Sequence, residues 1–325
     1  RRASPARRPS PRRAAPGDPA GTVRYRPTRA QQEIWLLNRA DRQATVYHLP
    51  VHVVLAQGIS AEVVRAALID VAARHEALRT VYPDNGGEPA AVVRGVDEAS
   101  VAAPMTAATL DATGIDLAVA APFDLTVDLP WRAVVDETGE RTELVLVAHH
   151  IAIDEWSLHI VVDDFAHALR ARLDGATPVW TEDAVAFSAA LSARSAAVDA
   201  AAEVHWAKTL REAPSRVVLP EPAQPVPARL TSGPATVLRR DIDRGARDRA
   251  AARARDYGTT LNTMLCVALS AVLAEYSDSD DFVLSVPVSG RFTTEELRPV
   301  GMFVETVPVR ITGVRRRSVA EALAR

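Results

Sequence analysis

Hydrophobic positions past Tyr25 recur with two periods, and this alternation predicts strands interleaved with helices. Residues 51–56 predict a strand, and the segment after them has a helical period. Ser60 is placed to cap that helix, whose buried face is expected to carry Val64, Leu68 and Val71. The part of the chain after Tyr25 is therefore predicted to include a strand followed by an amphipathic helix.

A second pair of strands is predicted on either side of a turn-rich segment. Residues 131–135 and 143–147 flank the polar connection 136–140, which favours an antiparallel hairpin. The run 144–148 is apolar throughout, as expected for a central strand that is buried on both faces. His149 and His150 end this run, so ionisable groups stand where a core would normally be apolar.

The chain then enters a predicted helix that ends near Leu173. Its apolar positions recur at helical spacing and are Leu158, Val161, Val162, Phe165 and Leu169. Residues 175–180 are expected to connect two lobes. A cluster of prolines follows and excludes regular structure, at Pro214, Pro220, Pro222, Pro225 and Pro227.

The second lobe is expected to contain a strand and two helices, followed by strands at 282–286 and 306–311. Its second helix is predicted to turn one apolar side inward, made of Leu261, Met264, Leu265, Ala268, Leu269, Val272 and Leu273.

Length and composition fit two lobes and exclude several classes of protein. A chain of 325 residues with 48% hydrophobic content can bury a large core and exceeds the usual size of one domain. The apolar stretches are too short for a bilayer and no signal peptide is visible, so a soluble, cytoplasmic protein is expected. The net charge of -3 gives no general argument for a nucleic-acid partner. The single cysteine, Cys266, excludes an internal disulfide and is expected to serve packing.

Residues 1–22 have a composition that predicts a disordered linker. Their basic side chains stand among prolines and are Arg1, Arg2, Arg7, Arg8, Arg12 and Arg13. Without large apolar side chains, such a segment cannot offset the entropy lost on ordering. A nucleic-acid-binding arm is the alternative, but no aromatic residues are interleaved with these arginines.

The two histidines cannot serve the same cavity, because adjacent residues of a strand point to opposite faces. Asp154, four residues beyond His150, can support the strand end or cap the following helix. A purely structural alternative makes His149 a satisfied core histidine and Ser157 the helix N-cap. No metal site is expected, because adjacent strand histidines diverge and no third His or Cys ligand is near them.

Four segments carry short motifs in a fixed order. Residues 28–37 read TRAQQEIWLL, 74–82 read RHEALRTVY, 149–157 read HHIAIDEWS, and 286–291 read VPVSGR before VGMFVETVPVR at 300–310. They resemble the AQxxxWxL, RHExLRTxF, HHxxxDxxS and PxxGR…GxFVNTxxxR motifs of nonribosomal peptide synthetase condensation domains. The resemblance runs from about Tyr25 to Arg325.

This resemblance implies an α/β fold, of the α+β two-layer kind, in which two chloramphenicol-acetyltransferase-like lobes form a V-shaped pseudo-dimer. The N-terminal lobe is expected over 23–178 and the C-terminal lobe over 179–325. The second lobe is expected to be incomplete, because whole condensation domains continue past the late strand. Two residues depart from the family pattern: Glu155 replaces the usual Gly and Glu305 the usual Asn.

The resemblance also assigns roles to the site residues. His150 is expected to face a channel between the lobes, where it orients the acceptor amine or acts as a general base, while His149 is structural. Asp154 is expected to be structural and tied to Arg291 of the second lobe; an Asp154 that orients His150 is the alternative. Candidates for the channel lining are Glu155, Trp156, Ser157, Ser289, Gly290 and Glu305. An imidazole is well suited to take a proton from an α-amine near neutral pH.

The implied activity is the formation of an amide bond between an aminoacyl or peptidyl thioester and a second aminoacyl amine. Upstream donor and downstream acceptor carrier proteins would deliver both on 4'-phosphopantetheine, beside an adenylation domain. No intrinsic cofactor, metal, nucleic acid or membrane is implied.

Three other interpretations are weighed against this activity. An epimerisation domain would use Glu155 or Glu305 as a second carboxylate, and a non-catalytic condensation-like module would recruit another protein. The spacing of His149 and Asp154 also matches the HxxxxD motif of glycerolipid acyltransferases, but the chain has no apolar segment to engage a membrane.

Overall fold

The computed structural model describes residues 22–97, 104–194, 200–214, 217–220, 238–277 and 279–323. The chain forms two compact units. The first contains Arg1–Leu191 with Arg298–Met302, and the second contains Ser192–Leu297 with Phe303–Arg325. Residues 175–180, expected to connect the lobes, lie within the first unit.

Some sequence predictions fall outside the described residues. The linker predicted over 1–22 does so except for Thr22, as do three of the five clustered prolines, Pro222, Pro225 and Pro227. The other two, Pro214 and Pro220, lie in segments without regular structure.

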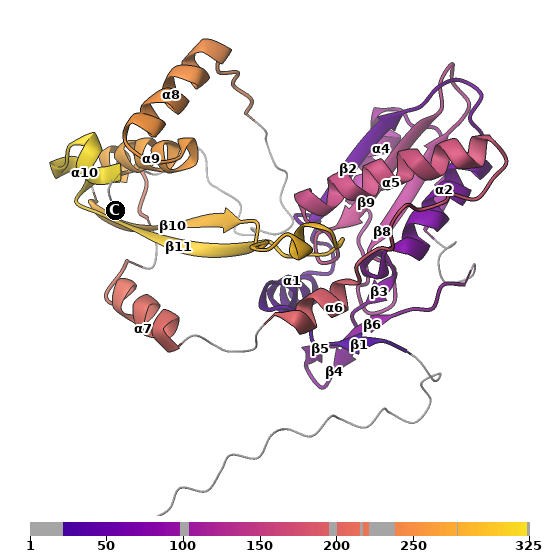
Figure 1. Cartoon of the computed structure of the whole chain (residues 1–325), viewed down its shortest axis with the longest axis horizontal. Helices are drawn as coiled ribbons and strands as arrows, with labels where there is room; N and C mark the ends of the chain where they lie inside the picture. Colours follow the sequence, from indigo (N-terminus) through magenta and orange to yellow (C-terminus); the bar gives the residue numbers. More distant parts are fainter. Residues whose placement is uncertain are drawn as a thin grey trace, which may run out of the picture. The chain divides into compact units, whose positions relative to one another are not determined.

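A four-stranded sheet forms the centre of the first unit (Figure 1). Its strands, in order across the sheet, are β2 (His48–Val54), β9 (Glu143–His149), β8 (Trp131–Asp136) and β7 (Met105–Ala107). The β2–β9 and β9–β8 pairs are antiparallel, and β7 runs parallel to β8. The predicted hairpin is confirmed. The strand predicted at 51–56 is shifted toward the N-terminus, because the chain turns near Gly58, whose φ is 82°.

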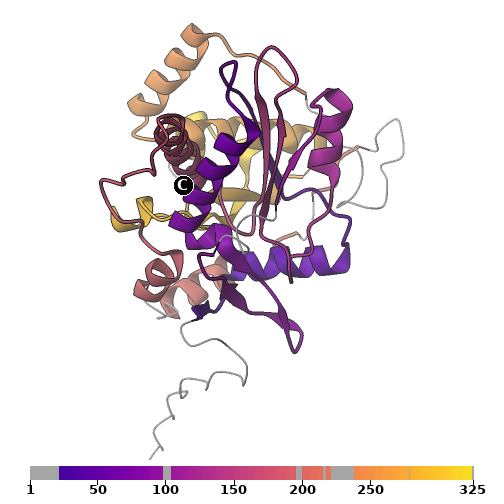
Figure 2. The ribbon, with the colours of Figure 1, turned by 90° about the vertical axis from the view of Figure 1, so that its right-hand side faces the viewer.

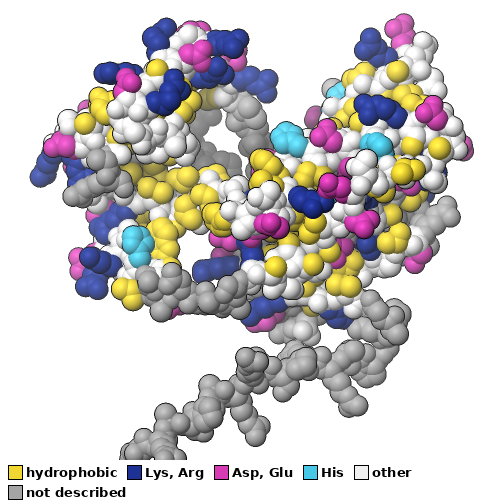
Figure 3. Space-filling model, viewed as in Figure 1, with side chains coloured by type: hydrophobic (Ala, Val, Ile, Leu, Met, Phe, Trp, Pro, Cys, Tyr) yellow, Lys and Arg dark blue, Asp and Glu magenta, His cyan; other side chains and the backbone are white. Residues whose placement is uncertain are grey.

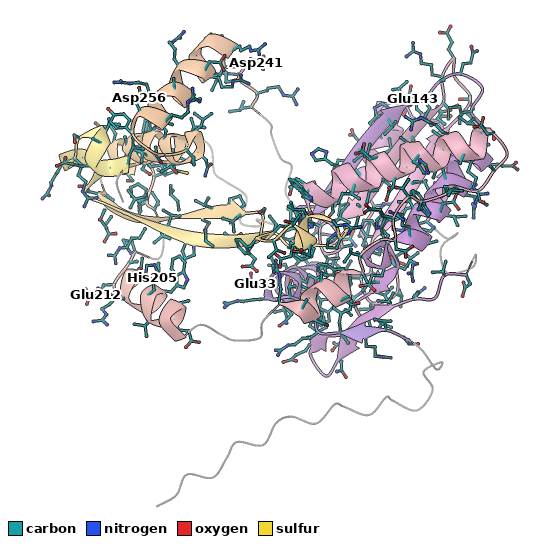
Figure 4. The ribbon with its side chains drawn as sticks, viewed as in Figure 1. Glu33, Glu143, His205, Glu212, Asp241 and Asp256 are labelled. Atoms are coloured by element: carbon teal, nitrogen blue, oxygen red, sulfur yellow. The ribbon has the colours of Figure 1, made fainter. Side chains whose placement is uncertain are left out.

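Strand β9 is the best covered strand of this sheet, because it lies between β2 and β8. Every residue from Leu144 to His149 is buried, whereas β8 alternates buried and half-buried positions. This confirms the prediction of a central strand covered on both faces. Glu143, labelled in Figure 4, begins the strand at the end opposite His149 and pairs with His52 Nε2 at 2.7 Å.

Helices α2 (Ala61–Arg74) and α5 (Glu155–Leu173) lie side by side in the first unit, as Figures 1 and 2 show. The predicted Ser60 cap is present, and Val64, Leu68 and Val71 are buried as predicted. Helix α5 buries Val161, Phe165 and Leu169, whereas Val162 is exposed. Arg172 of α5 and Asp70 of α2 are joined by an ion pair of 2.6 Å.

Smaller elements complete the first unit. Thr28 and Gln31 form a capping box at the start of α1 (Arg29–Ala40), and Asp111 caps α4 (Ala112–Ala120). The others are β1 (Arg24–Tyr25), η1 (Glu76–Arg79), β3 (Thr80–Val81), β4 (Asp84–Asn85), β5 (Glu88–Pro89) and β6 (Ala91–Val93). Along the chain, the division between the units falls within α6 (Phe187–Ala193).

The second unit is built on an antiparallel pair of strands, β10 (Asp281–Val288) and β11 (Glu305–Thr312). Both strands are confirmed, each slightly longer than predicted. The strand predicted ahead of the helices is not found at 238–243. The other elements are α7 (Ala200–Thr209), α8 (Arg244–Asp256), α9 (Leu261–Ser277), η2 (Glu295–Leu297), η3 (Val314–Arg316) and α10 (Val319–Leu323).

Helix α9 turns a different side inward from the one predicted. Ser270 and Ala274 are buried, whereas Leu265, Leu269 and Val272 are about half exposed. The helix contacts α8, η3 and α10, and Arg315 donates a hydrogen bond to the carbonyl of Ala274. The residues buried on this helix are therefore small ones, and the apolar side predicted to turn inward was wrong.

Helix α8 is strongly charged and carries exposed arginine side chains (Figure 3). Within the described ranges, no single helix is long and apolar enough to cross a membrane. By length and composition, α8 and α9 pass such a test only as a pair, with a bend of 99° between them.

Candidate active site

The site predicted from the sequence begins where β9 leaves the central sheet. The backbone N–H of His149 donates to Pro130 O at 2.8 Å, and that of His150 donates to Tyr47 O at 2.8 Å. Ala152 N then donates to His149 O at 3.0 Å and closes a tight turn. Both histidines are therefore fixed by backbone hydrogen bonds to neighbouring segments.

His149 is buried among aromatic rings. Its ring lies near those of Tyr47, His48 and Phe123, with centroids 5.6–6.3 Å away. Nδ1 accepts a hydrogen bond of 3.2 Å from the backbone N–H of Ile151, so the proton of the neutral ring belongs on Nε2. Burial, with nearby cationic groups, lowers the pKa of His149 to about 3. An uncharged, enclosed imidazole supports the structural role predicted for this residue.

His150 has a different environment, although it is the next residue. Its side chain is 16% exposed, and Nε2 lies 3.6 Å from Glu155 Oε1. Nδ1 is buried and has no hydrogen-bond partner among the described residues. Of the two ring nitrogens, Nε2 is therefore the one that a substrate can reach.

Asp154 caps α5 and ties its first turn to a distant segment. Its Oδ1 accepts hydrogen bonds from Ser157 N at 2.8 Å and Ser157 Oγ at 2.7 Å. Ser157 Oγ in turn accepts from Gly301 N at 3.0 Å and lies 2.8 Å from Gly301 O. Asp154, not Ser157, occupies the N-cap, so the alternative that made Ser157 the cap is wrong. Ser157 is fully buried and offers no surface to line a channel.

Gly301 must be glycine in this arrangement. A Cβ at this position would overlap the ring of Phe187, which is itself fully buried. The absence of a side chain lets residue 301 approach the Ser157 hydroxyl, so the glycine of the late motif meets the HHxxxDxxS motif inside the first unit.

Two residues of the earlier motifs brace the turn that follows the histidines. Gln31 Nε2 donates to Ile151 O at 2.7 Å and to Tyr82 Oη at 3.1 Å, and Tyr82 Oη donates to the same carbonyl at 3.3 Å. Burial raises the pKa of Tyr82 well above its ordinary value, so the hydroxyl keeps its proton. Trp35 Nε1 also binds Tyr82 O, at 2.9 Å. The sequence pattern contained these residues, but it gave no sign of their common target.

The RHExLRTxF segment anchors other parts of the first unit. Arg74 Nε and His75 Nε2 both contact Asp164 Oδ2 of α5, at 2.9 and 2.7 Å. Arg74 also stacks over the Trp180 ring at 4.3 Å, and Glu76 accepts from the backbone N–H of Ser188. These contacts hold the segment after α5 against α2.

Trp156, the second residue of α5, is exposed. Four other predicted site residues belong to the second unit. Gly290 has a φ of 63°, and a Cβ there would overlap the Phe303 carbonyl. Arg291 is buried, lies over the Phe303 ring at 4.2 Å and donates to Glu296 O at 2.6 Å. Ser289 Oγ accepts from Arg291 N at 3.4 Å, and Glu305 pairs with Arg194 at 3.7 Å. The ion pair expected between Asp154 and Arg291 stays a prediction.

The described residues include no group of three or more His, Cys, Asp or Glu side chains arranged to hold a metal ion.

Comparison with known proteins identifies the family. A family model, the condensation domain, matches residues 23–325. The chain is 30% identical over 333 residues to phosphinothricin tripeptide synthetase PhsB of Streptomyces viridochromogenes, covering 97% of this chain and 27% of that protein. It is 29% identical over 335 residues to the isonitrile lipopeptide synthase of Mycobacterium tuberculosis, covering 95% and 13%. The chain thus spans about a quarter or less of these relatives.

Solved structures agree with this assignment. The X-domain from teicoplanin biosynthesis, solved in complex with OxyB, matches with a TM-score of 0.79 at 26% identity, over 96% of this chain and 69% of that chain. The first condensation domain of the CDA synthetase matches with a TM-score of 0.69 at 21% identity, over 93% and 72%, which shows the fold. The predicted α/β fold of the chloramphenicol-acetyltransferase type is confirmed. The chain is a member of the condensation domain family of nonribosomal peptide synthetases.

Proposed function

We propose that this condensation domain forms an amide bond between two carrier-bound substrates, with His150 as the residue that contacts the acceptor amine. The observation that carries the proposal is the contrast at the end of β9. His149 is enclosed, whereas the neighbouring His150 presents Nε2 from a backbone that is fixed on both sides. A rigidly held imidazole of this kind can position an amine, accept its proton, or do both.

The proposed reaction joins a donor thioester to an acceptor ammonium group. The ammonium gives one proton to Nε2 of His150, and the nitrogen lone pair attacks the thioester carbonyl carbon. The carbon–sulfur bond breaks as the carbon–nitrogen bond forms. The nitrogen then loses its second proton to the departing thiolate, which leaves as the thiol of the donor's phosphopantetheine.

The partners proposed for this reaction are the two peptidyl carrier proteins and a neighbouring adenylation domain. Membership of the family supports them, because its synthetases carry substrates on phosphopantetheine thioesters. The thioester already activates the donor carbonyl, so the domain has only to supply binding, orientation and proton transfer.

The test is a reconstituted assay with separately loaded donor and acceptor carrier proteins, run over a panel of aminoacyl groups. Mass spectrometry of the acceptor carrier would show the dipeptidyl thioester, and chiral analysis would report the configuration of the donor α-carbon. Amide product with retained configuration is expected. Inversion without amide formation would assign the domain to epimerisation, and no product across the panel would refute the proposal.

A second candidate, protein recruitment, is favoured by one observation. The X-domain that matches this chain was solved in complex with OxyB. A recruiting domain would bind such a partner and leave the carriers unchanged. Titration with OxyB as the probe, beside the carrier assay, separates the two candidates: binding without amide product would favour recruitment.

A further inference from the structure

We infer that Glu155 makes the His150 site selective for a cationic acceptor, by holding the acceptor's ammonium group beside Nε2. This inference rests on the proposed function and adds a determinant of substrate choice. Glu155 is the first residue of α5 and stands where the family pattern usually has glycine. The carboxylate is therefore an addition to the motif, placed at the start of the helix that follows the strand end.

The distance between His150 Nε2 and the Glu155 carboxylate leaves both available to contact a ligand. Glu155 Oε1 lies 3.6 Å from His150 Nε2, which is too far for a good direct hydrogen bond. An ammonium group placed beside both could donate one N–H to the carboxylate and direct another toward the imidazole. The distance between the two side chains suits a shared ligand.

The surroundings do not neutralise this carboxylate. The Glu155 side chain is 69% exposed, and within the described part of the chain His150 provides its one ion pair. No lysine or arginine among those residues lies within ion-pair distance of it. A cation that approaches Nε2 therefore meets an accessible negative charge.

The chemistry predicts a preference for an amine over a hydroxyl of the same size. A carboxylate binds an ammonium through charge-assisted hydrogen bonds, which are about twice as strong as neutral ones. Because the carboxylate is largely exposed, solvent screens it, and we expect a preference of about two- to fivefold.

The experiment measures binding of two matched probes to the whole chain. Both are pantetheine amides, one ending in a glycyl ammonium and the other in a glycolyl hydroxyl, and their amide linkage prevents turnover. Dissociation constants would be measured by calorimetry at pH 7 for the native protein, Glu155→Gln and Glu62→Gln. Glu62 is the matched control, because it is also an exposed glutamate in the first turn of a helix, α2.

The native protein and Glu62→Gln should bind the glycyl probe about two- to fivefold more tightly than the glycolyl probe, and Glu155→Gln should bind both equally. The inference is overturned if Glu155→Gln keeps the preference, if the native protein shows none, or if the glycyl probe does not bind. Binding is read without turnover, so the two proposals can fail separately. A preference without amide formation in the carrier assay would refute only the proposed function, and amide formation without a preference only this inference.

Discussion

The loops that follow β9 and β10 carry motif residues of the same family, yet they are held in different ways. After β9, buried side chains brace the turn, because Gln31 and Tyr82 both bind the carbonyl of Ile151. After β10, a close backbone approach sets the loop, because Gly290 lies against the Phe303 carbonyl. The first arrangement fixes the position of an imidazole, and the second fixes the path of the chain. Substitutions should therefore break hydrogen bonds at one loop and create overlap at the other.

The largest effect on stability is expected at Gly290. Gly290→Ala places a Cβ onto the Phe303 carbonyl and forces a left-handed φ of 63° on a residue with a side chain. Strain and overlap together should lower the free energy of unfolding by about 3 kcal/mol. Gly258 is the matched control, since its φ is 67° but a Cβ there would meet no atom within 4 Å. Gly258→Ala should cost about 1 kcal/mol, and equal losses in urea denaturation would contradict this account.

His149 and His150 should differ almost as strongly. His149→Ala leaves a cavity among aromatic rings and removes the acceptor for Ile151 N–H, so it should cost about 2–3 kcal/mol. His150→Ala removes a partly exposed ring that makes no hydrogen bond among the described residues, and it should cost under about 1 kcal/mol. Thermal and urea unfolding of both variants would check the order. A reversed order would exchange the roles assigned to the two histidines.

A substitution at Gln31 tests the hydrogen bonds that hold the turn after β9. Gln31→Ala deprives the buried Ile151 carbonyl of its shortest hydrogen bond and should cost about 1–3 kcal/mol. Gln32 is the control, because it is the next residue of α1 and makes a local hydrogen bond to Pro27 O. Gln32→Ala should cost about 0.5–1 kcal/mol. The rate of amide formation should fall more for Gln31→Ala than for Gln32→Ala. Equal losses would show that the hydrogen bond from Gln31 to Ile151 O does not position His150.

Stability should also depend on pH through His149. The pKa of His149 is about 3 in the folded protein, below its ordinary value of 6.5, so the unfolded chain binds the proton more readily. This contribution to stability is fully present above pH 6.5 and is lost as the pH falls toward 3, at up to about 1.4 kcal/mol per pH unit. His149→Asn should have a shallower decline than the native protein in urea denaturation across this range. Parallel curves would show that His149 is not the group responsible.

Much of the first unit could be predicted from the sequence, because fully buried elements have the clearest pattern of hydrophobic residues. The run 144–148 gave a central strand, and the period after Ser60 gave α2 with the correct buried face. Helix α9 could not be predicted in this way. Its buried residues include the small Ser270 and Ala274, and a hydrophobic period does not identify such positions.

The residues of the site could be predicted from the sequence, but the contacts between them could not. Its motif placed His149 and His150 at a strand end and Asp154 at the start of a helix, where it is the N-cap. The bond from Gln31 to Ile151 spans 120 residues, and that from Gly301 to Ser157 spans 144. Local patterns carry no information on contacts of that range, so motif order indicated the family but not how the motifs meet.

The most direct test of the central claim is the single-turnover rate of amide formation by the native protein and by His150→Ala, measured with the same loaded carriers. We expect a loss of about 10²-fold or more for His150→Ala, because proton transfer and positioning are both removed. The free energy of unfolding should stay within about 1 kcal/mol of the native value. A His150→Ala protein that is folded and forms the amide at close to the native rate would contradict the claim that Nε2 of His150 serves the acceptor amine.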